Sequence, residues 1–447
     1  YISLGDWRLY FYDRDATAKV TPADVNKAAA TYFVRDNRAV GVFIPDDKPQ
    51  RAPYMETPKL ADVLKNATFK EEGAVSEAFD VSQANIDART EVLEINGVKT
   101  ALLPKKTRGE TVTVLTHFNY GTLETVKGKR ALDTLIEPML TRGAEGMDRT
   151  AISDKLTQLK VQGDILTFTT TRENVVAVIE LLGKLTSEST FPEKEVNQIV
   201  RQMTTMLEGK SDDPVTLGRD ALLKHFATYP EGDPRNRLTS RETLAAVKTV
   251  TRDELYAWYK NAVATTHGEV AVVGDFDKDA VKAALTKALG AKKPADKATD
   301  FVRYWADYKP VAAERIVIDT PAKENAVLLA RIDFKGSMFD AAATAYIKAP
   351  QNLARAELCA REEIARIVKD GITEKELSEA KKGILESRAV NRAQDDYLAQ
   401  GWLEFLSTGR TYAFSADFEA GVEKLTVADV NAALQKMIDP AGVTFVL

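Results

Sequence analysis

The sequence predicts an α+β fold built as a tandem array of one repeated unit. Three segments beginning at Thr21, Thr251 and Thr426 each carry an acidic residue within three positions, followed by an apolar pattern of helical period. Threonine is a favoured N-cap residue, and acidic side chains stabilise the first turn of a helix. Each segment leads to an apolar run typical of a buried strand, at residues 39–44, 269–274 and 443–447. The same order of helix and strand at three places indicates a repeat.

The intervals between these segments are unequal. Thr21 and Thr251 lie 230 residues apart, whereas Thr251 and Thr426 lie 175 apart. We therefore expect four regions: the C-terminal tail of a preceding unit (1–44), a linker (45–90), a complete repeat (91–300) and a second repeat (301–447). Four prolines within residues 45–60 support the linker, because proline cannot continue a helix and favours extended backbone.

The first repeat begins with two strands that we expect to pair antiparallel, at 98–103 and 111–118, and the second of them alternates in polarity. Its other expected elements, in chain order, are helices at 129–140 and 149–159, a strand at 165–171, helices at 175–185, 193–208, 215–226 and 253–263, the strand at 269–274 and a helix at 277–289.

The second repeat follows the same order with strands at 316–319 and 326–334. The first repeat has 46 residues between Phe118 and Ile165, enough for two helices, but the second has four between Phe334 and Phe339. Judged against the sister repeat, roughly 40 to 55 residues are missing after Phe334. A connection shortened by evolution is the alternative, and it would leave an apolar sheet face uncovered.

Composition excludes several classes of protein. Apolar residues make up 44% and charged residues 28% of the chain, which is typical of a globular domain. The net charge of −5, with both signs interspersed, gives no electrostatic reason to bind nucleic acid or an anionic membrane. No apolar run reaches the length of a membrane span, and residues 1–7 do not resemble a signal peptide. The single Cys359 excludes an internal disulfide and a cysteine-based zinc knuckle.

Several ordered segments resemble the insulinase (pitrilysin) family of zinc peptidases in its bacterial two-half form. They are residues 103–109, 170–174, 229–235, 272–276, 349–352 and 370–374, and together they extend over both repeats. The resemblance implies that each repeat is a mostly antiparallel sheet with helices packed on one face. It further implies two halves that close like a clamshell around a peptide, with this chain as the non-catalytic C-terminal half.

The family's metal motif, H-x-x-E-H on a helix, is degenerate in this sequence. Two histidines four positions apart can bind one zinc ion, and the glutamate between them takes a proton from the metal-bound water. At the matching positions the chain carries Thr134, Glu137 and Pro138, and Glu208 is the nearest match to the family's distant glutamate. Threonine and proline offer no nitrogen ligand, so we expect no catalytic residue and no metal ligand here. Zinc would be bound outside these residues.

No other local metal or catalytic pair is evident. No two of His117, His225 and His267 fall within five residues of each other, so we expect structural or surface roles for all three.

One segment has a possible role in substrate binding. The resemblance implies that it corresponds to a strand beside the active site in the catalytic half, where substrate backbone is paired. This possible substrate strand comprises Thr111, Val112, Thr113, Val114, Leu115, Thr116, His117 and Phe118. Alternation alone does not show whether a strand lies at an edge, so an ordinary sheet strand is the alternative.

Two functions follow from the resemblance. In the first, the chain is the non-catalytic half of a zinc metallopeptidase that encloses and positions a peptide or unfolded polypeptide, while the catalytic half lies on the same polypeptide or a partner chain. In the second, the chain is a catalytically dead paralogue acting as a structural or peptide-binding subunit beside a partner peptidase. We expect a periplasmic location because bacterial two-half relatives are often exported, with the cytoplasm as the alternative.

Overall fold

The computed structural model describes residues 1, 6–39, 41, 76–295, 301–307, 309–320, 323–334, 340–348 and 350–447. The chain divides into two compact units, Tyr1–Ala74 and Val75–Leu447. Most of the expected linker, and the residues directly after Phe334 where a segment was expected to be missing, lie outside the described residues. The domain boundaries drawn from the sequence stay predictions, except that residues 76–90, expected in the linker, belong to the second unit.

Within its described residues, the first unit contains short helices: α1 (Leu9–Thr17), α2 (Pro22–Tyr32) and the 3₁₀ turn η2 (Arg35–Asn37). Thr21 caps α2 in a capping box, because its hydroxyl accepts from the Asp24 N–H at 3.3 Å and the Asp24 carboxylate accepts from the Thr21 N–H at 2.9 Å. The same box is formed at Thr251 and Thr426, so the predicted caps are confirmed at all three positions.

The first repeat forms a six-stranded sheet in the order β1-β2-β8-β3-β7-β6. Only the pair of β2 and β8 is parallel, so the sheet is mostly antiparallel, as expected. Its strands are β1 (Glu91–Ile95), β2 (Val98–Pro104), β3 (Thr111–Phe118), β6 (Gln162–Gly163), β7 (Thr167–Thr171) and β8 (Gly268–Gly274). The other elements are α4 (Gln83–Arg89), α5 (Arg130–Leu140), β4 (Gly143–Ala144), β5 (Met147–Asp148), α6 (Arg149–Gln158), α7 (Val175–Ser187), α8 (Glu193–Glu208), α9 (Pro214–His225), α10 (Ser240–Lys248), α11 (Arg252–Asn261) and α12 (Lys278–Ala288).

The second repeat forms a four-stranded sheet in the order β11-β10-β12-β9. The strands are β9 (Arg315–Ile316), β10 (Ala326–Asp333), β11 (Asp340–Ile347) and β12 (Thr444–Val446). The helices are α13 (Leu353–Asp370), α14 (Glu374–Asn391), α15 (Asp395–Thr408), α16 (Tyr412–Lys424) and α17 (Val427–Met437). β10 pairs with β11 from Ala326↔Ile347 to Asp333↔Asp340, so within the described residues this repeat has no counterpart of α5 and α6.

Each repeat contributes one helix to the core of the other. The apolar face of the first sheet that carries Val98, Leu102 and Val112 packs with residues of α5, α7, α11 and α12. Its opposite face packs with Leu398 and Trp402 of α15, a helix of the second repeat. The expectation that helices pack on one face of the sheet is therefore incomplete, because this sheet is covered on both faces.

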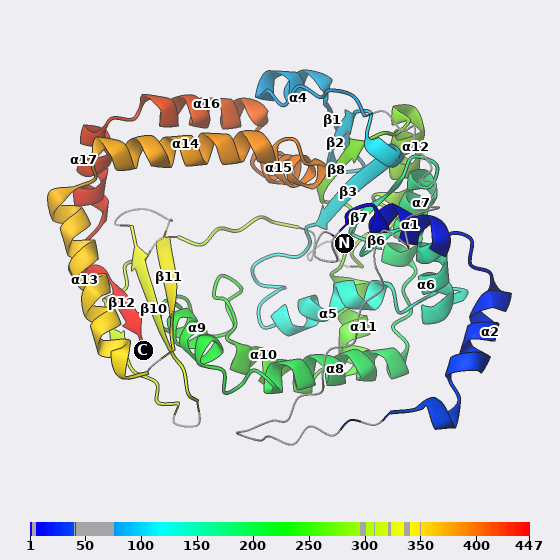
Figure 1. The fold of residues 1–447 in the computed structure, drawn as a ribbon, viewed down its shortest axis with the longest axis horizontal. Coiled ribbons are helices and arrows are strands. Elements are labelled where there is room, and N and C mark those ends of the chain that lie inside the picture. The colour runs from blue at the N-terminus through cyan, green and yellow to red at the C-terminus, as the bar shows by residue number, and fades with distance from the viewer. Residues whose placement is uncertain are drawn as a thin grey trace. The chain divides into compact units, whose positions relative to one another are not determined.

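The exchange is reciprocal. Leu222 of α9, a helix of the first repeat, packs with Val327, Leu329 and Val446 of the second sheet. Helix α13 covers the other face of that sheet, so β10 lies between α13 and α9 (Figure 1). Gly218 permits the close approach of α9, because a Cβ atom there would lie 2.4 Å from Leu329 Cδ1. Each repeat thus completes the core of the other.

Candidate functional site

Helix α5 carries the degenerate metal motif, and its chemistry does not suit a metal. The Thr134 hydroxyl donates to the carbonyl oxygens of Arg130 at 2.9 Å and Ala131 at 3.0 Å. Pro138 lies inside the helix and supplies neither a side-chain donor atom nor an N–H. Glu137 lies at the surface, where partial desolvation and the neighbouring Asp164 carboxylate raise its pKa. These residues cannot replace the two imidazole ligands that zinc requires at this motif.

The distant glutamate is engaged elsewhere. Glu208, the last residue of α8, forms an ion pair with Lys248 of α10 at 2.6 Å, with both side chains about half exposed. In the described ranges, no three histidine, cysteine, aspartate or glutamate side chains converge in a way that could hold a metal ion. The residues present therefore do not fit zinc, and Glu208 connects two helices.

The possible substrate strand is a central strand. β3 pairs with β7 from Thr111↔Thr171 to Leu115↔Thr167, and with β8 from Val112↔Gly274 to Phe118↔Gly268. The Thr116 N–H also donates to the Leu166 carbonyl oxygen at 2.8 Å. Because both edges are occupied, an added peptide strand has no free backbone groups to pair with along most of β3. A role of β3 in substrate binding stays a prediction, beside the alternative of an ordinary sheet strand.

A cavity of about 480 Å³ lies beside the degenerate motif, lined among others by Arg130, Asp133, Thr134 and Tyr304. The Asp133 carboxylate accepts hydrogen bonds from Trp258 Nε1 at 2.7 Å and from the Tyr120 hydroxyl at 3.2 Å. Burial raises the pKa of Asp133 despite these bonds. Trp258 is buried, and its hydrogen bond joins α11 to α5.

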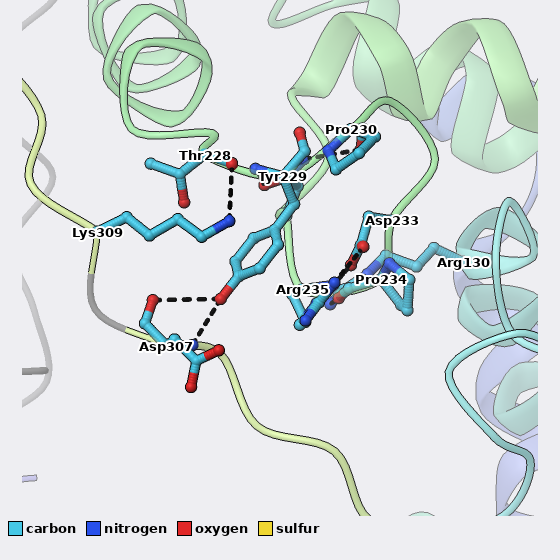
Figure 2. A network of polar contacts seen from close by, with 10 residues as sticks. Arg130, Thr228, Tyr229, Pro230, Asp233, Pro234, Arg235, Asp307 and Lys309 are labelled. Carbon is cyan, nitrogen blue, oxygen red and sulfur yellow. Dashed lines mark hydrogen bonds and ion pairs between the residues drawn. The ribbon is translucent and has the colours of Figure 1, made fainter.

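The loop between α9 and α10 is tied to two other segments, as Figure 2 shows. The Tyr229 hydroxyl accepts from the Asp307 N–H at 2.5 Å and donates to the Asp307 carbonyl oxygen at 3.2 Å. The Lys309 ammonium lies 3.8 Å from the centre of the Tyr229 ring, and the Arg130 guanidinium donates to the Pro234 carbonyl oxygen. These contacts connect the loop to the start of α5 and to the first residues of the second repeat.

An ion pair stiffens the same loop. Arg235 Nη2 and Asp233 Oδ2 lie 2.7 Å apart, and the Arg235 guanidinium lies 3.9 Å from the centre of the Tyr229 ring. The hydrogen bonds from Arg235 lower the pKa of Asp233 to about 2. Residues 229–235, one of the segments that carry the sequence resemblance, are therefore held by polar groups that bond to one another and to the backbone.

The histidines do not assemble a site. His225 Nδ1 lies 3.0 Å from Glu314 Oε2, and its Nε2 lies 2.9 Å from the Ala312 carbonyl oxygen. His117 ends β3, and the His267 ring lies 6.1 Å from the Phe301 ring. Their expected structural or surface roles agree with these positions.

No family model matches the sequence, and no curated protein matches it. Solved structures match the fold. The inactive domain of an M16 peptidase from Pseudomonas fluorescens has a TM-score of 0.63 and 17% identity, covering 80% of this chain and 97% of that chain. A protease from Helicobacter pylori has a TM-score of 0.63 and 14% identity, covering 80% of this chain and 98% of that chain. The periplasmic protease PqqL from Escherichia coli has a TM-score of 0.57 and 13% identity.

PqqL is about twice as long as the part that is similar, since 97% of this chain covers 51% of that chain. None of the described helices is long and apolar enough to cross a membrane. The expected architecture of repeated sheet-and-helix units, and its resemblance to the insulinase-type (M16) peptidases, is confirmed at the level of fold. This chain therefore has the fold of M16 peptidases, including a domain described as inactive in Pseudomonas fluorescens.

Proposed function

We propose that this chain is the non-catalytic half of a zinc-dependent metallopeptidase. One observation supports the proposal: the chain has the fold of M16 peptidases, and helix α5 carries Thr134 and Pro138 at the positions that the sequence resemblance matches to the metal-binding histidines. The zinc ion, its ligands and the general base would belong to a catalytic half on the same polypeptide or on a partner chain. The match to half of PqqL supports this arrangement, and the periplasmic location of PqqL supports the same compartment for this chain.

In this proposal the chain contributes confinement and positioning. Residues 91–300 and 301–447 form one wall of a chamber that holds a peptide or unfolded polypeptide. The part of the expected linker that precedes the second unit connects that wall to the catalytic half. A wall of this kind accelerates hydrolysis by holding the substrate in place and excluding bulk water. Opening and closing at the linker would then limit substrate entry and product release.

The alternative is a catalytically dead paralogue that acts as a structural or peptide-binding subunit. The observation that favours it is that 80% of this chain covers 97% of a Pseudomonas fluorescens chain that is described as an inactive domain. The two functions differ in whether an H-x-x-E-H motif lies on the same polypeptide.

The experiment is the intact mass and peptide map of the protein purified from its natural source. A polypeptide about twice the mass of these 447 residues, with an H-x-x-E-H motif in the additional part, would support the first function. A chain of this mass that copurifies with a motif-bearing peptidase would support the second. Purification of the chain alone, with no motif-bearing partner and no loss of peptidase activity when it is deleted from the source, would contradict both.

A further inference from the structure

The cavity of about 480 Å³ beside α5 contains polar groups that the proposed function does not use. Residues of α5, of α10 and of the loop between α9 and α10 line it, together with Tyr304. Its volume lies within the range of pockets that hold small molecules, and such pockets combine an apolar lining with a few convergent polar groups. The chemistry of the lining therefore indicates what the cavity can bind.

One carboxylate oxygen of Asp133 has no partner. The other oxygen, Oδ1, accepts both hydrogen bonds of this side chain, from Trp258 Nε1 at 2.7 Å and from the Tyr120 hydroxyl at 3.2 Å. Within the described ranges, no hydrogen bond or ion pair is formed by Asp133 Oδ2, although the residue lines the cavity. The nearby Arg130 guanidinium donates instead to the Pro234 carbonyl oxygen, at 3.1 Å from Nε (Figure 2). An ammonium group in the cavity would therefore give Oδ2 the partner that it lacks.

Two donors at the same cavity also lack partners. The Arg237 guanidinium is exposed and the Tyr304 hydroxyl belongs to a half-buried side chain. Neither side chain forms a hydrogen bond or an ion pair with another residue that the structure describes. Burial raises the pKa of Tyr304, so its hydroxyl keeps its proton at neutral pH. A guanidinium and a phenol both donate, and a carboxylate is the anion whose planar shape suits the guanidinium.

The remaining lining includes apolar side chains. Val126 is 5% exposed, Pro234 is buried, and Leu238 is half buried. A ligand that reaches the acceptor and the donors can therefore also place an apolar group against these three residues. An α-amino acid with an apolar side chain carries all three kinds of group: an ammonium, a carboxylate and an apolar chain.

We propose that this cavity binds a small zwitterion of the amino-acid type with an apolar side chain. Asp133 Oδ2 accepts from the ammonium, and Arg237 and Tyr304 donate to the carboxylate. Val126 and Leu238 contact the side chain. A free amino acid and a dipeptide share this chemistry. The inference concerns residues of this chain alone, so it does not depend on the zinc chemistry of a catalytic half.

The direct test is isothermal titration calorimetry of the 447-residue protein with L-leucine and two analogues that each remove one charge. N-acetyl-L-leucine lacks the ammonium, and L-leucinamide lacks the carboxylate. Each analogue should bind at least about tenfold more weakly than leucine, because a hydrogen bond to a charged group contributes about 1.5–3 kcal/mol. L-leucyl-L-leucine distinguishes the sources: tighter binding of the dipeptide assigns the site to dipeptides, and tighter binding of leucine assigns it to free amino acids.

Two variants locate the two ends of the ligand. Asp133→Asn keeps an acceptor for Trp258 and Tyr120 but removes the charge, so it should abolish the preference for leucine over N-acetyl-leucine. Arg237→Gln should reduce the preference for leucine over leucinamide at least about tenfold. A variant that only loosened the fold would weaken all ligands alike and leave these preferences in place.

The matched controls are Asp154→Asn on α6 and Arg241→Gln on α10, because both residues are exposed and do not line the cavity. Both controls should bind leucine as the wild type does. Circular dichroism checks that every variant folds. If Asp133→Asn does not fold, Arg237→Gln still decides the question, since Arg237 lies at the surface.

Three results would overturn this inference: no binding of leucine or leucyl-leucine, equal affinity of the wild type for leucine and N-acetyl-leucine, or unchanged preferences in the two folded variants. Failure of the proposed peptidase function would be seen separately, as stoichiometric zinc or catalysis in this chain, and it would leave the calorimetric result standing.

Discussion

Replacing Trp402 with alanine tests the exchange of helices between the two repeats. Trp402 lies on α15, which belongs to the second repeat, but its side chain is 1% exposed in a cluster with Leu103 and Val273 of the first sheet. Its ring also packs edge-on against the Tyr412 ring, with the ring centres 5.4 Å apart. Removing the side chain should therefore destabilise the first repeat as well as the second.

The size of the effect follows from the burial. A buried tryptophan removes 150–250 Å² of surface from water, which corresponds to about 4–6 kcal/mol at about 25 cal/mol per Å². The Trp402 indole N–H is buried and has no hydrogen-bond partner, which costs the folded state about 1–3 kcal/mol. The alanine variant removes this cost together with the side chain. We therefore expect Trp402→Ala to lower the free energy of unfolding by about 3 kcal/mol, the lower end of the range for such truncations.

Urea denaturation followed by circular dichroism measures this change, and hydrogen exchange locates it. The variant should increase exchange in β8, which lies more than a hundred residues away in the sequence, as well as in α15. The matched control is Trp305→Ala, because Trp305 is 61% exposed, and it should change stability by less than about 0.5 kcal/mol. A loss below about 1 kcal/mol for Trp402→Ala, or faster exchange confined to residues 301–447, would refute the reasoning.

Three further predictions follow from local geometry. Gly183→Ala should destabilise the protein by about 1–3 kcal/mol in urea denaturation, because a Cβ atom there would lie 2.8 Å from the backbone of α12. Gly421→Ala on α16 is its control, and it should be neutral or stabilise the protein by up to about 1 kcal/mol, since nothing lies within 4 Å. Asp233→Asn should lower the melting temperature at pH 7, and the difference should vanish as pH falls from about 4 to 2, because the stability from a carboxylate of lowered pKa is lost over that interval; an equal difference at both ends would contradict the ion pair. Thr134→His/Pro138→His should bind no stoichiometric zinc in elemental analysis, because no third ligand is in place; one zinc per chain would show that the site can be rebuilt.

Local features of the fold could be predicted from the sequence because they depend on residues close together in the chain. The capping boxes at Thr21, Thr251 and Thr426 need only a threonine and an acidic residue three positions later, and all three are formed. The strand predicted at 111–118 coincides with β3, since alternation in polarity identifies a strand and its faces.

Features that depend on distant neighbours could not be predicted in this way. Alternation along β3 says nothing about its two neighbours, β7 and β8, which pair with it on either side. The apolar stripe of α15 predicts burial but does not identify the sheet of the other repeat as its partner. The spacing between Pro138 and Glu208 likewise gave no indication that Lys248 pairs with the glutamate. In each case the missing information is the topology of the chain.

We propose that these residues lack the chemistry of peptide hydrolysis and serve a catalytic half. The most direct measurement is the zinc content and the chelator-sensitive cleavage of a fluorescence-quenched peptide, determined for the 447-residue chain alone and for the assembly purified from its natural source. We predict no stoichiometric zinc and no cleavage for the chain alone, and both for the source assembly. One zinc per chain together with chelator-sensitive cleavage by these 447 residues alone would contradict the account.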